Sequence, residues 1–401
     1  MHHRWRRTSC VPGSVRMASS GPKTLTTRVT RPSGGATGRC WPGASASGSA
    51  CSRTMPGLLC YGLAVQNGIY TLLALSSALL ALLALALALS TTSVCPSGWR
   101  PQLSSRQQFL GPHSSVLAKA RAAYLVKRYV RKGIPREHRK QVWMALSGAA
   151  AMQSEERGLY QSLLQQNRKP DLVETIQIDV PRTFPDNVYF HGGGQQQQSL
   201  FNVLVAYAHF NRGVGYCQGL NFIVGLLLLA TEDEEASFWL LRALLERLLP
   251  DYYGRHMTGL LTDIEVLAQL VRERMPEVHA HLAKHDVSWA IVTTKWFVCL
   301  FAEVLPTETV LRVWDCLFLE GSKVLFRVAL TLVSHSQAEI LAAGNLGEVM
   351  AAFRKAASGN HATDCHSFLR AIFRGPKSLK RVHIEQLRQT CRAQVVAAAQ
   401  R

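Results

Sequence analysis

The sequence has no acidic residue before Glu137, although its first third is rich in arginine. Its 401 residues include 45 Lys and Arg against 26 Asp and Glu, a net charge of +19, and 18 of the basic residues precede Glu137. From Glu137 onward the balance is 27 basic against 26 acidic residues. The excess charge belongs to an N-terminal extension, and the rest of the chain lacks the surplus typical of nucleic-acid binders. We expect no nucleic-acid partner.

The chain also lacks the common signatures of catalytic and metal sites. No CxxC pair occurs among its 10 cysteines, and the patterns GxxxxGK[ST], GxSxG and HExxH are absent. These absences exclude a P-loop, a serine-hydrolase elbow and a zinc-peptidase site of the usual form. A disulfide framework is not expected at this chain length, so we expect reduced, mostly buried thiols. The spacing that comes nearest to a metal-ligand set is His361, Cys365 and His366.

The first hundred residues divide into two compositions. Residues 1–56, rich in Gly, Ser, Thr, Pro and Arg, have no apolar periodicity and are predicted to be disordered. Residues 57–92 are apolar, and 69–89 would span about 31 Å as a helix, enough to cross a bilayer core. The segment is either a membrane anchor with a cytosolic C-terminal domain or an atypical N-terminal variant that never meets a membrane, with a mitochondrial transit peptide as a third alternative. We assign 93–117 as a linker.

The remaining region, 118–401, is predicted to be one all-α domain of many helices. Apolar residues recur at three- and four-residue spacing, and period-two strand runs are absent. We expect a helix over 199–211, preceded by a flexible polar insertion at 191–198, and an apolar helix over 222–229. The pair Thr231 and Glu234 has the spacing of a capping box at the start of the next helix.

Two polar segments are hard to explain by packing alone. In the first, Pro181 and Pro185 interrupt any helix, so Arg182 is predicted to project from a stiff loop. In the second, a glycine-marked turn over 213–221 places Gln218 where a helix begins. One interpretation is structural, with Arg182 in a surface ion pair and Gln218 as a hydrogen-bonding residue. The other is phosphoryl transfer to water, in which an arginine neutralises the transferring phosphate and a glutamine orients the water.

Four motifs in order resemble those of TBC domains, the Rab GTPase-activating fold, over about Tyr124 to the C-terminus. Ile176-x-x-Asp179-x-x-Arg182 resembles the arginine-finger motif, and Tyr216-Cys-Gln218 resembles the glutamine-finger motif. Upstream stands Gly133-Ile-Pro135 with Arg139-x-x-x-Trp143, and downstream stands the stretch from Arg312 to Gly321, which contains Trp314, a predicted core residue. Two departures from the family are the insertion 191–198 and the first hundred residues.

The resemblance implies a GTPase activator that completes a partner's active site and has no substrate site of its own. Arg182 and Gln218 would be the catalytic residues, supplied in trans to a GTP-bound Rab-family GTPase that carries its own Mg-GTP. The implied setting is cytoplasmic vesicle trafficking, with membrane association through 69–89 as an option. Supporting roles are implied for Asp179, Tyr216, Asn221, Arg139 and Trp143, the last two beneath the finger loop or as packing residues.

Two rival functions remain open at this stage. The first is a TBC-shaped scaffold that binds GTPases or membranes without accelerating hydrolysis. The second is a binder of anionic polymers or membrane surfaces that depends on residues 1–120 alone, which predicts steep salt dependence.

Overall fold

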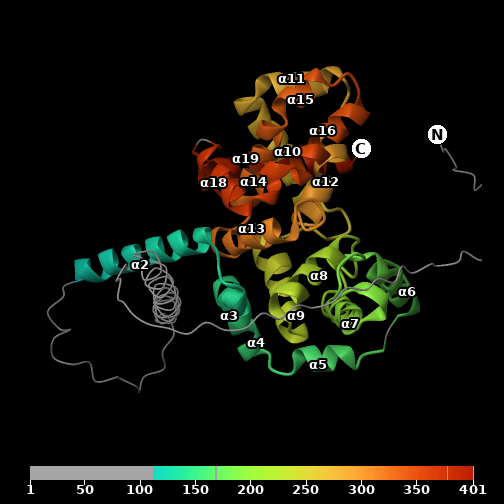
Figure 1. The fold of residues 1–401 in the computed structure, drawn as a ribbon. Helices are drawn as coiled ribbons and strands as arrows, with labels where there is room; N and C mark the ends of the chain where they lie inside the picture. Colours follow the sequence, from blue (N-terminus) through green and yellow to red (C-terminus); the bar gives the residue numbers. More distant parts are fainter. Residues whose placement is uncertain (1–111, 168, 377, 401) are drawn as a thin grey trace, which may run out of the picture. The chain divides into compact units, whose positions relative to one another are not determined.

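The computed structural model describes residues 112–167, 169–376 and 378–400, which contain helices and no strand (Figure 1). The prediction of an all-α domain is thereby confirmed. The extension and the apolar segment 69–89 lie outside the described residues, so their boundaries stay predictions. Among the described residues, no helix is both long enough and apolar enough to span a membrane.

Most helices that precede residue 250 pack around α7, α8 and α9, whereas α2 has its main contact with α13. α8 is apolar on every side because it packs against α3, α7, α9 and α13 at once. The helices of this group are α2 (Pro112–Lys132), α3 (Arg136–Ser147), α4 (Ala149–Glu155), α5 (Leu159–Leu164), α6 (Pro170–Asp179), α7 (Gln195–Phe210), α8 (Leu220–Thr231) and α9 (Glu234–Ala243), with short turns η2 (Val180–Arg182), η3 (His191–Gly193) and η4 (Leu244–Leu248).

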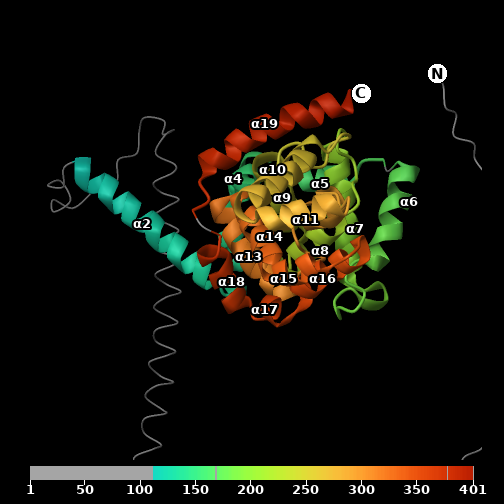
Figure 2. The ribbon, with the colours of Figure 1, turned by 90° about the horizontal axis from the view of Figure 1, so that it is seen from above.

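The helices after residue 250 form a second group, joined to the first chiefly through α13, which packs against α2, α3 and α8. The C-terminal helix α19 lies along α10, as Figure 2 shows. The helices of this group are α10 (Thr258–Arg274), α11 (Pro276–Lys284), α12 (Trp289–Val298), α13 (Thr307–Glu320), α14 (Lys323–His335), α15 (Gln337–Ala342), α16 (Leu346–Ser358), α17 (Asn360–Thr363), α18 (Cys365–Arg374) and α19 (Arg381–Ala399).

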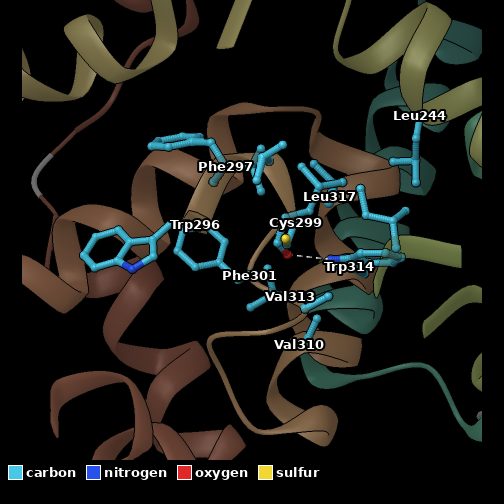
Figure 3. Close-up of a cluster of buried hydrophobic side chains, with 14 of the residues drawn as sticks. Leu244, Trp296, Phe297, Cys299, Phe301, Val310, Val313, Trp314 and Leu317 are labelled. Carbon is cyan, nitrogen blue, oxygen red and sulfur yellow. Dashed lines mark hydrogen bonds between the residues drawn. The ribbon is translucent and has the colours of Figure 1, made fainter. Parts of the chain in front are cut away.

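The core includes the hydrophobic cluster in Figure 3, to which α12 and α13 both contribute side chains. Trp314 is fully buried and donates its Nε1–H to the Leu300 carbonyl at 3.0 Å, so its ring is packed without an unsatisfied donor. This confirms the prediction that Trp314 is a core residue. Cys299 lies in the same cluster, and all five described cysteines are free thiols, three of them buried.

The start of α7 differs from the sequence-based expectation. The helix begins at Gln195 rather than at residue 199, so the second half of the expected flexible insertion is its first turn. Gln197 donates from Nε2 to the Phe190 carbonyl at 2.5 Å, and Gln198 donates to Asn202 Oδ1 at 2.9 Å. Glutamine is a good helix former, but a polar run has no apolar periodicity that would reveal a helix.

The expected capping box of α9 is also wrong. Asp233 caps the helix, since its Oδ1 accepts a hydrogen bond from the Ala236 N–H at 2.8 Å. Thr231 is the last residue of α8, and its Oγ1 accepts from the Asp233 N–H at 3.2 Å. Aspartate and threonine are both good N-caps, so residue type alone could not show which of the two caps α9.

Candidate functional site

The predicted arginine-finger segment is helical and not the stiff loop that its prolines suggested. α6 continues to Asp179, and the single turn η2 follows it directly. Pro181 fits the beginning of this turn because its missing N–H is not needed there. Arg182 therefore ends a helical segment, and its side chain is 58% exposed.

Asp179 connects the two segments predicted to carry the fingers, 176–182 and 216–218, which are called the finger segments below. Its Oδ1 lies 2.6 Å from Arg182 Nη2, and its Oδ2 accepts a hydrogen bond from the Tyr216 hydroxyl at 2.6 Å. Burial, followed by this hydrogen bond to Asp179, raises the pKa of Tyr216, so the hydroxyl remains a donor. Because Tyr216 belongs to the same tripeptide as Gln218, this bond brings the segment after α7 to the end of α6.

A second link runs through the side-chain amide of Asn221, which is buried. Its Nδ2 donates to Thr183 Oγ1 at 2.9 Å, and its Oδ1 accepts from the Gly219 N–H at 3.1 Å. Thr183 is also buried and donates to the Asp179 carbonyl at 2.9 Å. The start of α8 is thus attached to the residue that follows Arg182.

The backbone beyond Arg182 is held in an uncommon conformation. Phe184 has φ of 48°, a left-handed value that bulky residues rarely adopt. Its ring packs edge-on against Phe222 with the centroids 5.6 Å apart. A methyl group on Gly225 would come within 3.0 Å of both Thr183 and Phe184. Close packing against α8 therefore stabilises this part of the finger segment.

Gln218 lies two residues before α8 and is exposed. Gly219, which follows it, has φ of 108°, a conformation that favours glycine. The structure thus brings the segments of Arg182 and Gln218 together through Asp179 and Tyr216, and neither side chain is walled in by the core.

Comparison with known proteins identifies the family of the domain. Residues 136–341, which include both finger segments, match the Rab-GTPase-TBC domain family. The chain belongs to the Rab-GTPase-TBC domain family. This confirms the resemblance seen in the four motifs, and the all-α fold around α7 to α9 is that of a TBC domain.

The chain is similar to proteins that carry the TBC name over most of their length. It is 54% identical over 274 residues to Growth hormone-regulated TBC protein 1-A of Danio rerio, covering 68% of this chain and 77% of that protein. It is 51% identical over 274 residues to Growth hormone-regulated TBC protein 1 of Homo sapiens, covering 68% of this chain and 82% of that protein.

Two solved TBC structures share the fold. The Chlamydomonas flagellar RabGAP TBC domain superimposes with a TM-score of 0.56 at 34% identity, over 62% of this chain and 83% of that one. The Ypt/Rab-GAP domain of Gyp1p gives a TM-score of 0.55 at 21% identity, over 63% and 91% of the two chains, a likeness of fold alone.

Within the TBC domain, Arg139 and Trp143 have their hydrogen bonds away from the finger segments. Arg139 Nε donates to Asp315 Oδ1 at 3.1 Å, and Trp143 Nε1 donates to the same oxygen at 2.8 Å. The Ile134 N–H donates to Oδ2 at 3.1 Å. Burial raises the pKa of Asp315 to about 6, with Arg139 acting in the opposite direction. These residues connect α3 to α13, which agrees with the packing role given as the alternative to a position beneath the finger loop.

The residues with the nearest metal-ligand spacing are engaged with other partners. His366 Nδ1 lies 3.2 Å from Arg312 Nη1, and the ring of His361 lies 5.1 Å from that of His335. No group of three or more His, Cys, Asp or Glu in the part of the chain that the structure describes could hold a metal ion.

Sequence reasoning missed three residues that shape the segment around Arg182, namely Thr183, Phe184 and Gly225. Thr183 and Phe184 follow Arg182 directly, but nothing in a single sequence distinguishes a buried threonine from an exposed one in an irregular segment. Gly225 interrupts an otherwise apolar helix, and a glycine inside a helix is a signal of close packing. The sequence therefore contained a signal for the close packing at Gly225.

Proposed function

We propose that this TBC domain accelerates GTP hydrolysis by a GTP-bound Rab-family GTPase, with Arg182 and Gln218 supplied in trans. The observation that carries the proposal is the shared contact of Asp179, which holds Arg182 and Tyr216 on two oxygens of one carboxylate. This contact gives a reason for the two finger segments to occupy one surface. Membership of the Rab-GTPase-TBC domain family supports the choice of partner.

Arg182 is arranged as a charge that a partner can recruit. Its Nε donates to the Ile178 carbonyl at 3.1 Å and its Nη2 pairs with Asp179, yet 58% of the side chain is exposed. The transferring phosphoryl group of GTP accumulates charge that a guanidinium can neutralise in a water-poor interface. We propose that Arg182 then points into the partner's site from the fixed end of η2.

Gln218 has the complementary task of orienting the attacking water. A side-chain amide offers a donor and an acceptor at once, which suits a water that must be held as well as aligned. The Tyr216 contact with Asp179 and the Asn221 contact with Thr183 limit the positions that Gln218 can take. In this proposal Mg-GTP comes with the GTPase, and the TBC domain has no cofactor and no substrate site of its own.

The decisive experiment is the exchange of Arg182 for alanine in a GTP-hydrolysis assay with a panel of Rab-family GTPases. Arg182→Ala should reduce the acceleration by ~10³ or more, while the circular dichroism spectrum stays unchanged because the side chain is exposed. Arg392→Ala is the matched control, since Arg392 is 52% exposed and also pairs with an aspartate, Asp251, at 2.7 Å. Acceleration by Arg182→Ala equal to that of wild type would contradict the proposal.

The same assay separates catalysis from a scaffold function. A non-catalytic scaffold would bind GTP-loaded partners without changing their hydrolysis rate, and Arg182→Ala would leave that binding as it is. Exposure of both finger residues favours catalysis, because a scaffold has no need for either.

We further propose that the domain works in the cytoplasm in vesicle trafficking, with membrane association through 69–89 as an open option.

A further inference from the structure

The backbone next to Gln218 lies against the end of α12. A methyl group on Gly219 would come within 3.3 Å of Cys299 Sγ and 3.4 Å of both γ carbons of Val298. These distances are shorter than most contacts that a β-carbon makes, so a side chain at position 219 would be crowded. The second group of helices therefore contacts the residue that directly follows Gln218.

The end of α12 has an unusual backbone. Leu300 and Phe301 have φ of 49° and 64°, left-handed values that large side chains rarely adopt. Among the described residues, no other two neighbours in sequence, glycine aside, both have positive φ. Helices commonly end with a glycine in this conformation, because glycine adopts it without a steric cost. Residues 298–301 are called the α12 turn below.

Buried contacts maintain the α12 turn in this conformation. The Phe301 N–H donates to the Trp296 carbonyl at 2.8 Å. Trp314 Nε1 donates to the Leu300 carbonyl at 3.0 Å, the bond drawn in Figure 3. Leu300 and Phe301 are both fully buried, and a strained backbone persists only where its surroundings determine it, often at functional sites. The α12 turn is therefore a fixed support for the residue after Gln218.

Tyr253 fixes the part of the α12 turn that contacts Gly219. Its hydroxyl donates to the Val298 carbonyl at 2.9 Å, and burial keeps the pKa of Tyr253 well above its usual value, so the hydroxyl remains a donor. Burial, and after it the charge of Glu303, raises the pKa of the Cys299 thiol to about 12. The contact between Cys299 and Gly219 is therefore packing by a neutral sulfur.

We propose that the α12 turn is a positioning element for Gln218, with Val298 and Cys299 as the positioning residues. This inference rests on the proposed function, in which Gln218 orients the attacking water. The hydrogen bond of Tyr216 restrains the backbone on one side of Gln218, and the α12 turn restrains it on the other. With both restraints the carboxamide has fewer positions from which to hold the water, and a well-oriented group contributes more to the rate than a loose one.

Val298→Ala tests the proposal because it removes the two γ carbons that contact Gly219. In the full chain, kcat for stimulated GTP hydrolysis should fall by about tenfold, because displacement of a water-orienting group slows the chemical step. KM for the GTPase should stay within about twofold of wild type, since Val298 is buried and does not reach the partner. Without a GTPase, amide hydrogen exchange of residues 213–221, measured by mass spectrometry, should become about threefold faster or more.

Two further variants separate positioning from a general loss of stability. Val292→Ala removes the same atoms from another buried valine of α12 and should leave kcat and the exchange of residues 213–221 within about twofold of wild type. Val298→Thr keeps two γ atoms of similar size and should restore kcat to within about twofold of wild type. A purely structural role for Val298 would instead make Val292→Ala and Val298→Ala equally poor activators.

Three results would overturn the proposal. They are a wild-type kcat in Val298→Ala, unchanged exchange of residues 213–221 in that variant, and an equal loss of kcat in Val292→Ala. Arg182→Ala should lower kcat and leave the exchange of residues 213–221 unchanged, so loss of catalysis and loss of positioning have separate readouts. If wild type accelerated no GTPase, the proposed function would fail, and the exchange rates would still decide whether the α12 turn positions Gln218.

Discussion

At the scale of single residues, the site depends on the two oxygens of Asp179. One oxygen pairs with Arg182 and the other accepts from Tyr216, so a carboxylate is required and an amide could not replace it. An asparagine would offer one acceptor and present an NH₂ group to one of two donors. The residue is 5% exposed, which makes each of these contacts stronger than it would be in water.

Tyr216→Phe tests this arrangement with the loss of a single oxygen. We expect stimulated GTP hydrolysis to fall by about tenfold, since one hydrogen bond to a charged group is lost and Gln218 is less well positioned. The free energy of unfolding, measured by urea denaturation, should fall by about 1–3 kcal/mol because Asp179 Oδ2 is left unpaired. Tyr124→Phe, at an exposed tyrosine on α2, should change neither quantity. Unchanged hydrolysis would show that the contact does not position Gln218.

At the scale of helices, the segment that contains Arg182 is held in its conformation by packing against α8. Phe184 lies in its left-handed conformation against Phe222, and Gly225 leaves room for it. The position of Arg182 therefore depends on packing against the first two turns of α8 as well as on its own segment.

Gly225→Ala should displace the finger segment while the helix stays intact. Alanine favours a helix by about 1 kcal/mol over glycine, but its methyl group would lie 3.0 Å from Thr183 and Phe184. We expect a reduced kcat for stimulated hydrolysis with little change in melting temperature. Gly254→Ala, where the new methyl group would meet nothing within 4 Å, is the control. If Gly225→Ala has normal kcat, the packing against α8 is not what positions Arg182.

The sequence predicted the helices better than their ends, and the residues of the site better than their contacts. Apolar periodicity identified the body of α7, but its polar first turn was missed because glutamines leave no periodic signal. The finger motifs indicated Asp179 and Tyr216, yet their hydrogen bond joins positions 37 residues apart and depends on how α6 packs on α7. Arg139 and Trp143 were indicated as supporting or packing residues, but nothing in the sequence indicated their common partner Asp315, which follows 172 residues after Trp143. Single-sequence patterns are local, and such pairings are not.

At the scale of the whole domain, Asp315 joins the two groups of helices. It lies on α13 and accepts hydrogen bonds from Ile134, Arg139 and Trp143, which belong to α3 and the connection before it. Its burial favours the protonated acid, and these donors favour the carboxylate. The balance raises its pKa to about 6, so the junction should respond to mild acid.

The sign of that response can be measured. An acid whose pKa is higher in the folded state binds protons more tightly there, so its contribution to stability falls as pH rises from about 4 to about 6 and is constant above that range. The difference in unfolding free energy between wild type and Asp315→Asn should therefore decrease across this window, by roughly 1.4 kcal/mol for each pH unit. Urea denaturation of both proteins from pH 4 to 7 gives the result. A difference that grows with pH would show that the donors outweigh burial.

The ion pair between Arg182 and Asp179 also bears on how the domain would leave its partner. If the guanidinium moves to the phosphates of GTP, Asp179 remains nearby and keeps its bond to Tyr216. Once the terminal phosphate has departed, the nucleotide attracts Arg182 less strongly, and the Asp179 carboxylate can pair with Arg182 again. Asp179 would thereby shorten the lifetime of the complex that remains after hydrolysis, so that one TBC domain could act on many GTPases in succession.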